Sequence, residues 1–155
     1  MPGRVILLCG LPGSGKTTVA KQLEVEGAVR FCPDEWMMAL GVDLWEDDGF
    51  RFRLEQLQWV LAQELLGQGL RVVIEWGVWA REERDTVRER ARELGAAVEL
   101  RYLDVSMDEL WERIQRRNAE PMWQARGIAR TDLEYWAAII QPPTTEELAL
   151  FDSPT

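Results

Sequence analysis

Residues 10–17 form a glycine-rich segment, Gly-Leu-Pro-Gly-Ser-Gly-Lys-Thr, which limits the folds open to this chain. It directly follows the apolar run Val5–Cys9, which predicts a strand buried on both faces of a parallel sheet. After it, Val19 and Leu23 lie four positions apart, which is helical spacing. A buried strand, a glycine turn and a helix in this order indicate an α/β fold that can bind an anion at the helix N-terminus.

The segment matches the phosphate-binding pattern G-x-x-x-x-G-K-[ST] at every position. Its glycines can adopt positive φ angles and bring backbone N–H groups around a phosphate. In this pattern Lys16 reaches the β- and γ-phosphates of a nucleotide, and the Thr17 hydroxyl ligates Mg²⁺. Lysine is otherwise rare here, because 16 of the 18 basic residues are arginine. We therefore expect a nucleotide to bind at Gly10, Leu11, Pro12, Gly13, Ser14, Gly15, Lys16, Thr17 and Thr18.

The rest of the chain alternates between strand and helix patterns. Further strands are expected at Val29–Cys32, Arg71–Glu75 and Val98–Asp104. The expected helices cover residues 34–40, 50–67, 82–94 and 107–117, and the stretch between Thr131 and Pro142. Two helix starts have the spacing of a capping box, Ser106 with Glu109 and Thr131 with Glu134. Such alternation predicts right-handed βαβ crossovers and a parallel sheet with helices on both faces.

Length and composition indicate one folded domain. At 155 residues, 46% hydrophobic and 29% charged, the chain is expected to form a single domain over residues 1–155. Histidine is absent, which excludes His-ligated zinc and Ser-His-Asp catalysis. The net charge of −9 disfavours nucleic acid as a bulk partner. Cys9 and Cys32 are expected to be buried free thiols. No apolar run approaches ~18 residues, and the first residues do not have the pattern of a signal peptide, so we expect no signal peptide and a soluble cytoplasmic protein without membrane contact.

Carboxylates follow three of the expected strands, at the edge where parallel sheets bind ligands. Asp34 could take a proton from an attacking hydroxyl or could cap the next helix, and Glu35 is the adjacent alternative for the first role. Glu75 ends the third strand, as the acid of a Walker B element does, although Asp is the usual residue there. It could support Mg²⁺ or be a surface charge. Asp104 is the alternative metal support, but its position just before the cap Ser106 favours a structural role.

Arg113 and Arg117 lie four positions apart and therefore share a helix face. Residues 118–130 have the length and glycine content of a lid, which with its flanking arginines covers about residues 113–131. Arginines near a lid can neutralise the charge that develops on a transferred phosphoryl group, and a solvated basic face is the alternative. Arg116, Arg126 and Arg130 are weaker candidates for the same charge-neutralising role.

The helix over residues 82–94 is so rich in charge that we expect it to lie at the surface. Arg84, Arg88 and Arg92 would form one row on this helix. Two of these arginines have an acidic partner three positions earlier, in the pairs Asp85–Arg88 and Glu89–Arg92. Arg81 and Arg84, at its start, are the candidate exceptions. Of the eight tryptophans, we expect three in the core, Trp59, Trp111 and Trp136. Three others follow strand ends, where they could line an acceptor pocket, Trp36, Trp76 and Trp79.

Four blocks together resemble a known family. They are residues 10–18, Cys-Pro-Asp-Glu-Trp at 32–36, Val-Ile-Glu-Trp-Gly-Val-Trp-Ala-Arg-Glu-Glu-Arg at 73–84 and Arg-Ile-Gln-Arg-Arg-Asn at 113–118. The chain, from residue 4 to about 147, is similar to bacterial P-loop kinase-like ATP-binding proteins. These are the AAA-family ATPases of the polynucleotide-kinase, zeta-toxin and chloramphenicol-phosphotransferase type.

The resemblance implies a three-layer α/β fold, with a parallel sheet of four or five strands in the order 2-3-1-4, helices on both faces and a small helical lid. It also implies an ATP-dependent phosphotransferase that uses Mg²⁺. In this family Asp34 matches the general base, and Arg113 and Arg117 match the lid arginines.

The sequence thus favours a kinase that moves the γ-phosphate of ATP to a hydroxyl of a small molecule, with Lys16, Asp34, Arg113 and Arg117 as catalytic residues and Thr17 with Glu75 at the metal. Two alternatives remain. A 5′-hydroxyl polynucleotide kinase would bind oligonucleotides with a strong salt dependence. An ATP-binding switch would hydrolyse ATP slowly or not at all.

Overall fold

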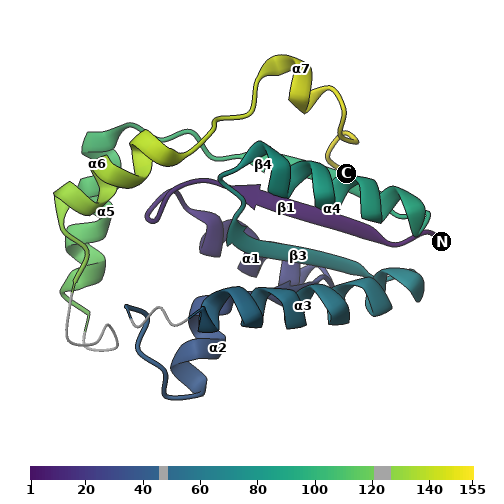
Figure 1. Cartoon of the computed structure of the whole chain (residues 1–155), viewed down its shortest axis with the longest axis horizontal. Helices are drawn as coiled ribbons and strands as arrows, with labels where there is room; N and C mark the ends of the chain where they lie inside the picture. Colours follow the sequence, from purple (N-terminus) through teal and green to yellow (C-terminus); the bar gives the residue numbers. More distant parts are fainter. Residues whose placement is uncertain (46–48, 121–126) are drawn as a thin grey trace.

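The computed structural model describes residues 1–45, 49–120 and 127–155. Its sheet has four parallel strands in the order β2-β3-β1-β4 (Figure 1). The strands are β1 (Arg4–Cys9), β2 (Val29–Phe31), β3 (Arg71–Gly77) and β4 (Ala97–Tyr102). The expected strand order is therefore confirmed.

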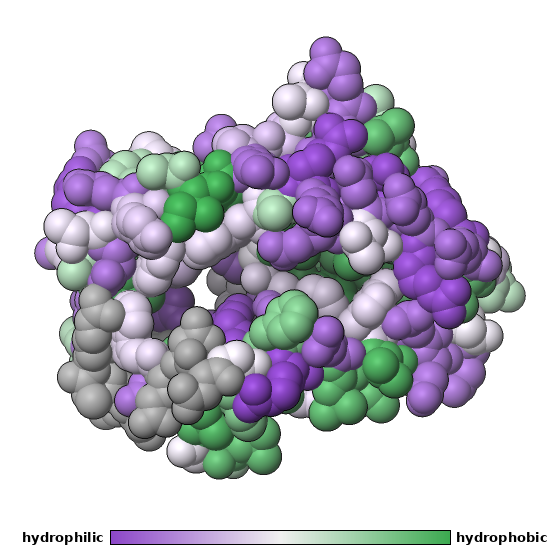
Figure 2. Space-filling view, in the orientation of Figure 1, coloured by the Kyte–Doolittle hydropathy of each residue, from purple (hydrophilic) through white to green (hydrophobic). Residues whose placement is uncertain are grey.

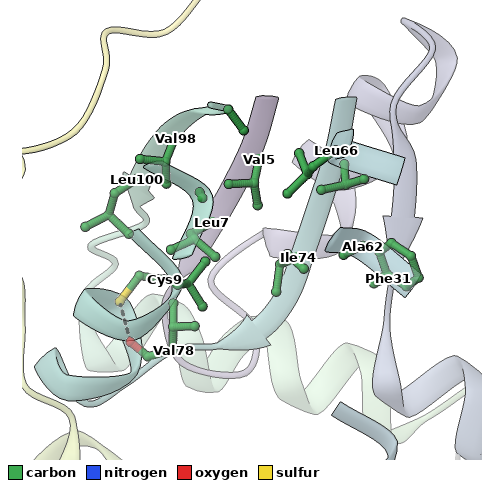
Figure 3. Close-up of a cluster of buried hydrophobic side chains, with 14 residues drawn as sticks. Val5, Leu7, Cys9, Phe31, Ala62, Leu66, Ile74, Val78, Val98 and Leu100 are labelled. Carbon is green, nitrogen blue, oxygen red and sulfur yellow. Dashed lines mark hydrogen bonds between the residues drawn. The ribbon is translucent and has the colours of Figure 1, made fainter. Parts of the chain in front are cut away.

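Helices cover both faces of this sheet. On one face, α1 (Lys16–Val25) packs Ala20 and Leu23 against Ile6 and Leu8 of β1. On the other face lie α3 (Phe50–Gly67) and α4 (Arg81–Glu93), which contribute Ala62 and Leu66, and Val87 and Ala91, to a larger cluster (Figure 3). Because alternate residues of β1 point to opposite faces, its continuous apolar run serves both layers. Cys9 and Cys32 are buried free thiols, as expected.

The remaining helices include three that gather at the end toward which the strands point (Figure 1). They are α2 (Pro33–Ala39), α5 (Met107–Asn118) and α6 (Arg130–Ile139). The last two pack on each other through Leu110, Ile114 and Leu133. A short α7 (Thr145–Leu148) follows them. No helix within the described ranges is both long enough and apolar enough to cross a membrane.

The two helix starts predicted from capping boxes differ in outcome. Ser106 caps α5, because its Oγ accepts a hydrogen bond from the Glu109 N–H at 3.3 Å. The prediction that Thr131 caps α6 is wrong, since α6 already begins at Arg130. Instead, the Asp132 carboxylate reaches back and accepts from the Ala129 N–H at 2.8 Å. A carboxylate three residues into the helix can satisfy this N–H without a capping hydroxyl.

Of the two candidate exceptions on the charged helix α4, Arg84 is buried, whereas the Arg81 side chain is 44% exposed. Arg84 is fully buried and pairs with Glu147 of α7, with an Nε–Oε2 distance of 2.6 Å. Its NH1 and NH2 groups donate to the carbonyls of Val78 and Gln141, both at 2.8 Å. Arg84 can therefore be buried because acceptors from three segments surround its guanidinium.

The rest of the charged row on α4 lies closer to the surface. The predicted Asp85–Arg88 pair is present at 2.7 Å, whereas Arg92 pairs with Asp152 of the C-terminal segment at 2.7 Å.

Candidate active site

The glycine loop between β1 and α1 forms a cradle for an anion. Gly13 and Gly15 have φ angles of +84° and +98°, in the left-handed region that favours glycine. A Cβ on Gly13 would also lie 3.2 Å from the Ile114 side chain, which is closer than ordinary packing. Gly15 precedes α1 and provides no side-chain cap, so backbone N–H groups of the first turn are left for a ligand. The loop therefore fits the phosphate groups of a nucleotide.

Lys16 holds its ammonium against this loop. Its Nζ donates to the carbonyl oxygens of Gly10 and Leu11, both at 2.9 Å. Burial lowers the pKa of Lys16 to about 8, while the charges of Asp34 and Glu75 act to raise it. The ammonium thus lies within electrostatic reach of both predicted carboxylates.

Thr17 and Glu75 meet beside the cradle. The Thr17 hydroxyl donates to Glu75 Oε1 at 2.8 Å, and Glu75 is only 5% exposed. Hydroxyl and carboxylate oxygens suit Mg²⁺, which usually keeps waters and phosphate oxygens as its other ligands. The pair therefore fits a magnesium ion, although the described part of the chain contains no cluster of three metal-binding side chains. Asp104 is exposed and lies just before Ser106, the cap of α5.

Asp34 lies in the first turn of α2, where Cys32 is the N-cap and Pro33 the first helical residue. The alternative that Asp34 caps this helix is therefore wrong. Its carboxylate forms an ion pair with Arg51 of α3, and the neighbouring Glu35 pairs with Arg30 of β2 at 2.5 Å.

The two predicted lid arginines also reach this region. Arg113 donates to the Gly13 carbonyl at 3.0 Å and to Glu109 at 2.7 Å. Burial lowers the pKa of Arg117, and the charge of Asp34 opposes that shift, so the two side chains interact electrostatically.

The weaker arginines of the lid set have other partners. Arg116 pairs with Glu112 and Arg130 with Asp108, at 2.5 and 2.8 Å. Arg126, with the middle of the expected lid, lies outside the described residues.

The tryptophans predicted at the acceptor pocket differ in position, since one contacts the glycine loop and two pack on the core. Of the three expected at the acceptor pocket, Trp79 contacts the loop, because its Nε1 donates to the Gly10 carbonyl at 3.0 Å. Trp79 also packs on Trp136, which stacks on Trp45 with ring centroids 6.1 Å apart. Trp36 and Trp76 instead pack against the large core cluster. Of the tryptophans expected in the core, Trp59, Trp111 and Trp136 are half-buried against the clusters.

Three charged residues at the site were not predicted from the sequence: Arg30, Arg51 and Glu55. Arg51 lies 3.7 Å from Glu55 one helical turn later, and burial raises the pKa of Glu55 to about 7. The helical spacing of Arg51 and Glu55 was the signal that could have pointed to these two residues.

Figure 2 shows a hollow between the end formed by α5 and α6 and the body of the molecule.

Comparison with known proteins adds to this geometry. The AAA domain family model matches residues 5–138. No curated protein matches the chain.

Solved structures share the fold. A chain of the Pnkp1/Rnl/Hen1 RNA repair complex has a TM-score of 0.75 and 20% identity, over 88% of this chain and 43% of that one. Kti12 from Chaetomium thermophilum, in complex with ADP-AlF3, has a TM-score of 0.68 and 14% identity, over 92% and 82%. A gluconokinase from Sinorhizobium meliloti 1021 has a TM-score of 0.58 and 23% identity, over 94% and 78%. This chain spans less than half the length of the RNA repair chains that it resembles. At these identities the likenesses show the three-layer fold of P-loop kinases.

Proposed function

Because the chain belongs to the AAA domain family and has the fold of P-loop kinases, we propose that it is an ATP-dependent phosphotransferase acting on a hydroxyl of a small molecule. One observation carries the proposal. Lys16 and the Thr17–Glu75 hydrogen bond lie beside one glycine cradle, with the Asp34 carboxylate within electrostatic reach of Lys16.

Each residue has a role that follows from its place. The loop N–H groups and Lys16 bind the β- and γ-phosphates. Thr17 and Glu75 hold Mg²⁺, which when bound neutralises phosphate charge. Asp34 accepts the proton of the attacking hydroxyl, and Arg113 and Arg117 stabilise the charge on the transferred group. Most of the rate enhancement then comes from positioning.

A 5′-hydroxyl polynucleotide kinase is the second candidate. The likeness to a chain of an RNA repair complex favours it. The net charge of −9 opposes it, because an acidic protein repels a polyphosphate backbone.

The first experiment measures acceptor-stimulated ADP release with hydroxylated metabolites, antibiotics and short oligonucleotides. With an acceptor in hand, Asp34→Asn should lower kcat by about 10²–10⁴-fold and leave ATP affinity unchanged, because a base acts on the acceptor. Asp85→Asn, on the surface of α4, is the matched control and should keep full activity. Unchanged turnover in Asp34→Asn would remove the base assignment, and ATP binding without any phosphotransfer would support a nucleotide switch instead.

A further inference from the structure

Arg30 is a buried arginine that the proposed mechanism does not use. Its side chain is 7% exposed. In the sheet it lies opposite Val73 of β3, and Glu75 is two residues further along that strand. Because side chains alternate along strands, Arg30 and Glu75 project from the same face of the sheet. The strand register therefore brings this guanidinium to the metal-side carboxylate.

Two carboxylates share the Arg30 guanidinium. Its Nε donates to Glu75 Oε2, and its NH1 donates to Glu35 Oε2 at 2.5 Å. The other oxygen of Glu75 accepts from the Thr17 hydroxyl at 2.8 Å. A continuous series of hydrogen bonds thus runs from Thr17 through Glu75 and Arg30 to Glu35.

The two ends of this series lie in different halves of the site. Thr17 and Glu75 belong to the side of the nucleotide and metal, whereas Glu35 is in the first turn of α2, next to Asp34. We propose that Arg30 is a positioning residue, which fixes α2 and its Asp34 relative to Thr17 and Glu75. This inference rests on the proposed function. A planar guanidinium can serve both carboxylates at fixed angles, which a lysine ammonium cannot reproduce.

The position matters because phosphoryl transfer depends on placement. A shift of about 1 Å in a reacting group can slow a reaction by about 10²-fold. Without Arg30, the buried Glu75 would lose its ion-pair partner, and the hydrogen-bonded link from α2 to β3 through this guanidinium would be lost. Both the orientation of the Thr17 hydroxyl and the placement of Asp34 would then relax.

Two variants separate the two arms of Arg30. Glu35→Gln removes the charge of a side chain that is 44% exposed, so the fold should tolerate it. We expect it to lower kcat by about 10-fold, with little change in the KM for ATP. Arg30→Lys should lower kcat by about 100-fold. Magnesium should increase the affinity for ADP less in Arg30→Lys than in the wild-type protein, whereas the affinity for ADP alone should stay unchanged. Both affinities are measured by tryptophan fluorescence, with and without magnesium.

Arg4→Lys is the matched control. Arg4 pairs with the buried Glu99 at 2.7 Å, but at the opposite end of the strands. It should change neither kcat nor the magnesium-dependent affinity, and thermal unfolding of all three variants shows whether each is folded.

Several results would overturn the inference. Wild-type kcat and magnesium-dependent affinity in Arg30→Lys would do so, as would equal losses in Arg4→Lys. If Arg30→Lys does not fold, Glu35→Gln decides, and an unchanged kcat there rejects the role. A loss of about 10²–10⁴-fold in Glu35→Gln, with kcat of Asp34→Asn nearly unchanged, would make Glu35 the base instead. Absence of nucleotide binding by the wild-type protein would reject the proposed function itself.

Discussion

Lys16 is held in a position that favours phosphate binding but disfavours its own charge. Its pKa is lowered from 10.5 to about 8 by burial, with Asp34 and Glu75 opposing the shift. A bound triphosphate would surround the ammonium with negative oxygens and raise its pKa again. Lys16 therefore takes up a proton on ATP binding whenever the pH lies between the two pKa values.

This linkage predicts a pH dependence of nucleotide affinity. Affinity for ATP should be full below about pH 8 and fall above it, by up to about tenfold per pH unit, as the free lysine loses its proton. Titration calorimetry from about pH 7 to about pH 9.5 measures it. Lys16→Arg, which stays charged over this range, should give a flat profile at whatever affinity it has. A flat profile in the wild-type protein would contradict the assigned contact between Lys16 and the phosphates.

Among the elements, α7 is held to α4 by the buried ion pair Arg84–Glu147, and Arg81 of α4 lies 3.8 Å from the same carboxylate. The Arg84 and Glu147 side chains are each 1% exposed. Removing one partner of such a pair leaves the other charge buried, which costs about 3–5 kcal/mol. We expect Glu147→Gln to lower the free energy of unfolding by about that amount in urea denaturation.

The exposed Glu112–Arg116 pair provides the comparison, with side chains 64% and 72% exposed. Glu112→Gln should change the free energy of unfolding by less than about 1 kcal/mol. Equal effects of the two substitutions would show that the buried pair contributes no more than a surface one.

The start of α5 gives a second prediction at this scale. Ser106→Ala removes the acceptor of the Glu109 N–H and should destabilise the protein by about 1 kcal/mol. Thr131→Ala should change stability by less than about 0.5 kcal/mol, because Thr131 lies within α6 and does not cap it. The reverse order in thermal unfolding would restore the capping role that the sequence suggested for Thr131.

At the scale of the whole molecule, the net charge of −9 bears on which of the two candidate acceptors is used, and the salt dependence of activity tests this. Acceptor-stimulated ADP release by a small hydroxylated compound should change little between about 50 and 200 mM salt, because few phosphate contacts are involved. An oligonucleotide acceptor would lose affinity steeply over the same range. Stimulation by oligonucleotides alone, with a steep salt dependence, would favour the polynucleotide kinase.

The features that depend on neighbours along the chain were predictable from the amino-acid sequence. The glycine loop, the four strands and the Ser106 cap follow from backbone preference and apolar periodicity, and the carboxylates Asp34 and Glu75 follow from their place after strands. The strand order came from the family resemblance, since periodicity does not say which strands pair.

Which charged residues pair with each other depends on the folded arrangement of the elements. The pairs Arg51–Asp34, Arg30–Glu75 and Arg84–Glu147 join residues 17, 45 and 63 positions apart. In the sequence, Arg30 and Arg51 look like the other arginines of the chain, and Arg84 differs only by its place at the start of a helix. Only the register of β2 on β3 and the packing of α3, α4 and α7 select them, because an ion pair depends on distance and burial in space, whereas helix and strand formation depends on residues nearby in the chain.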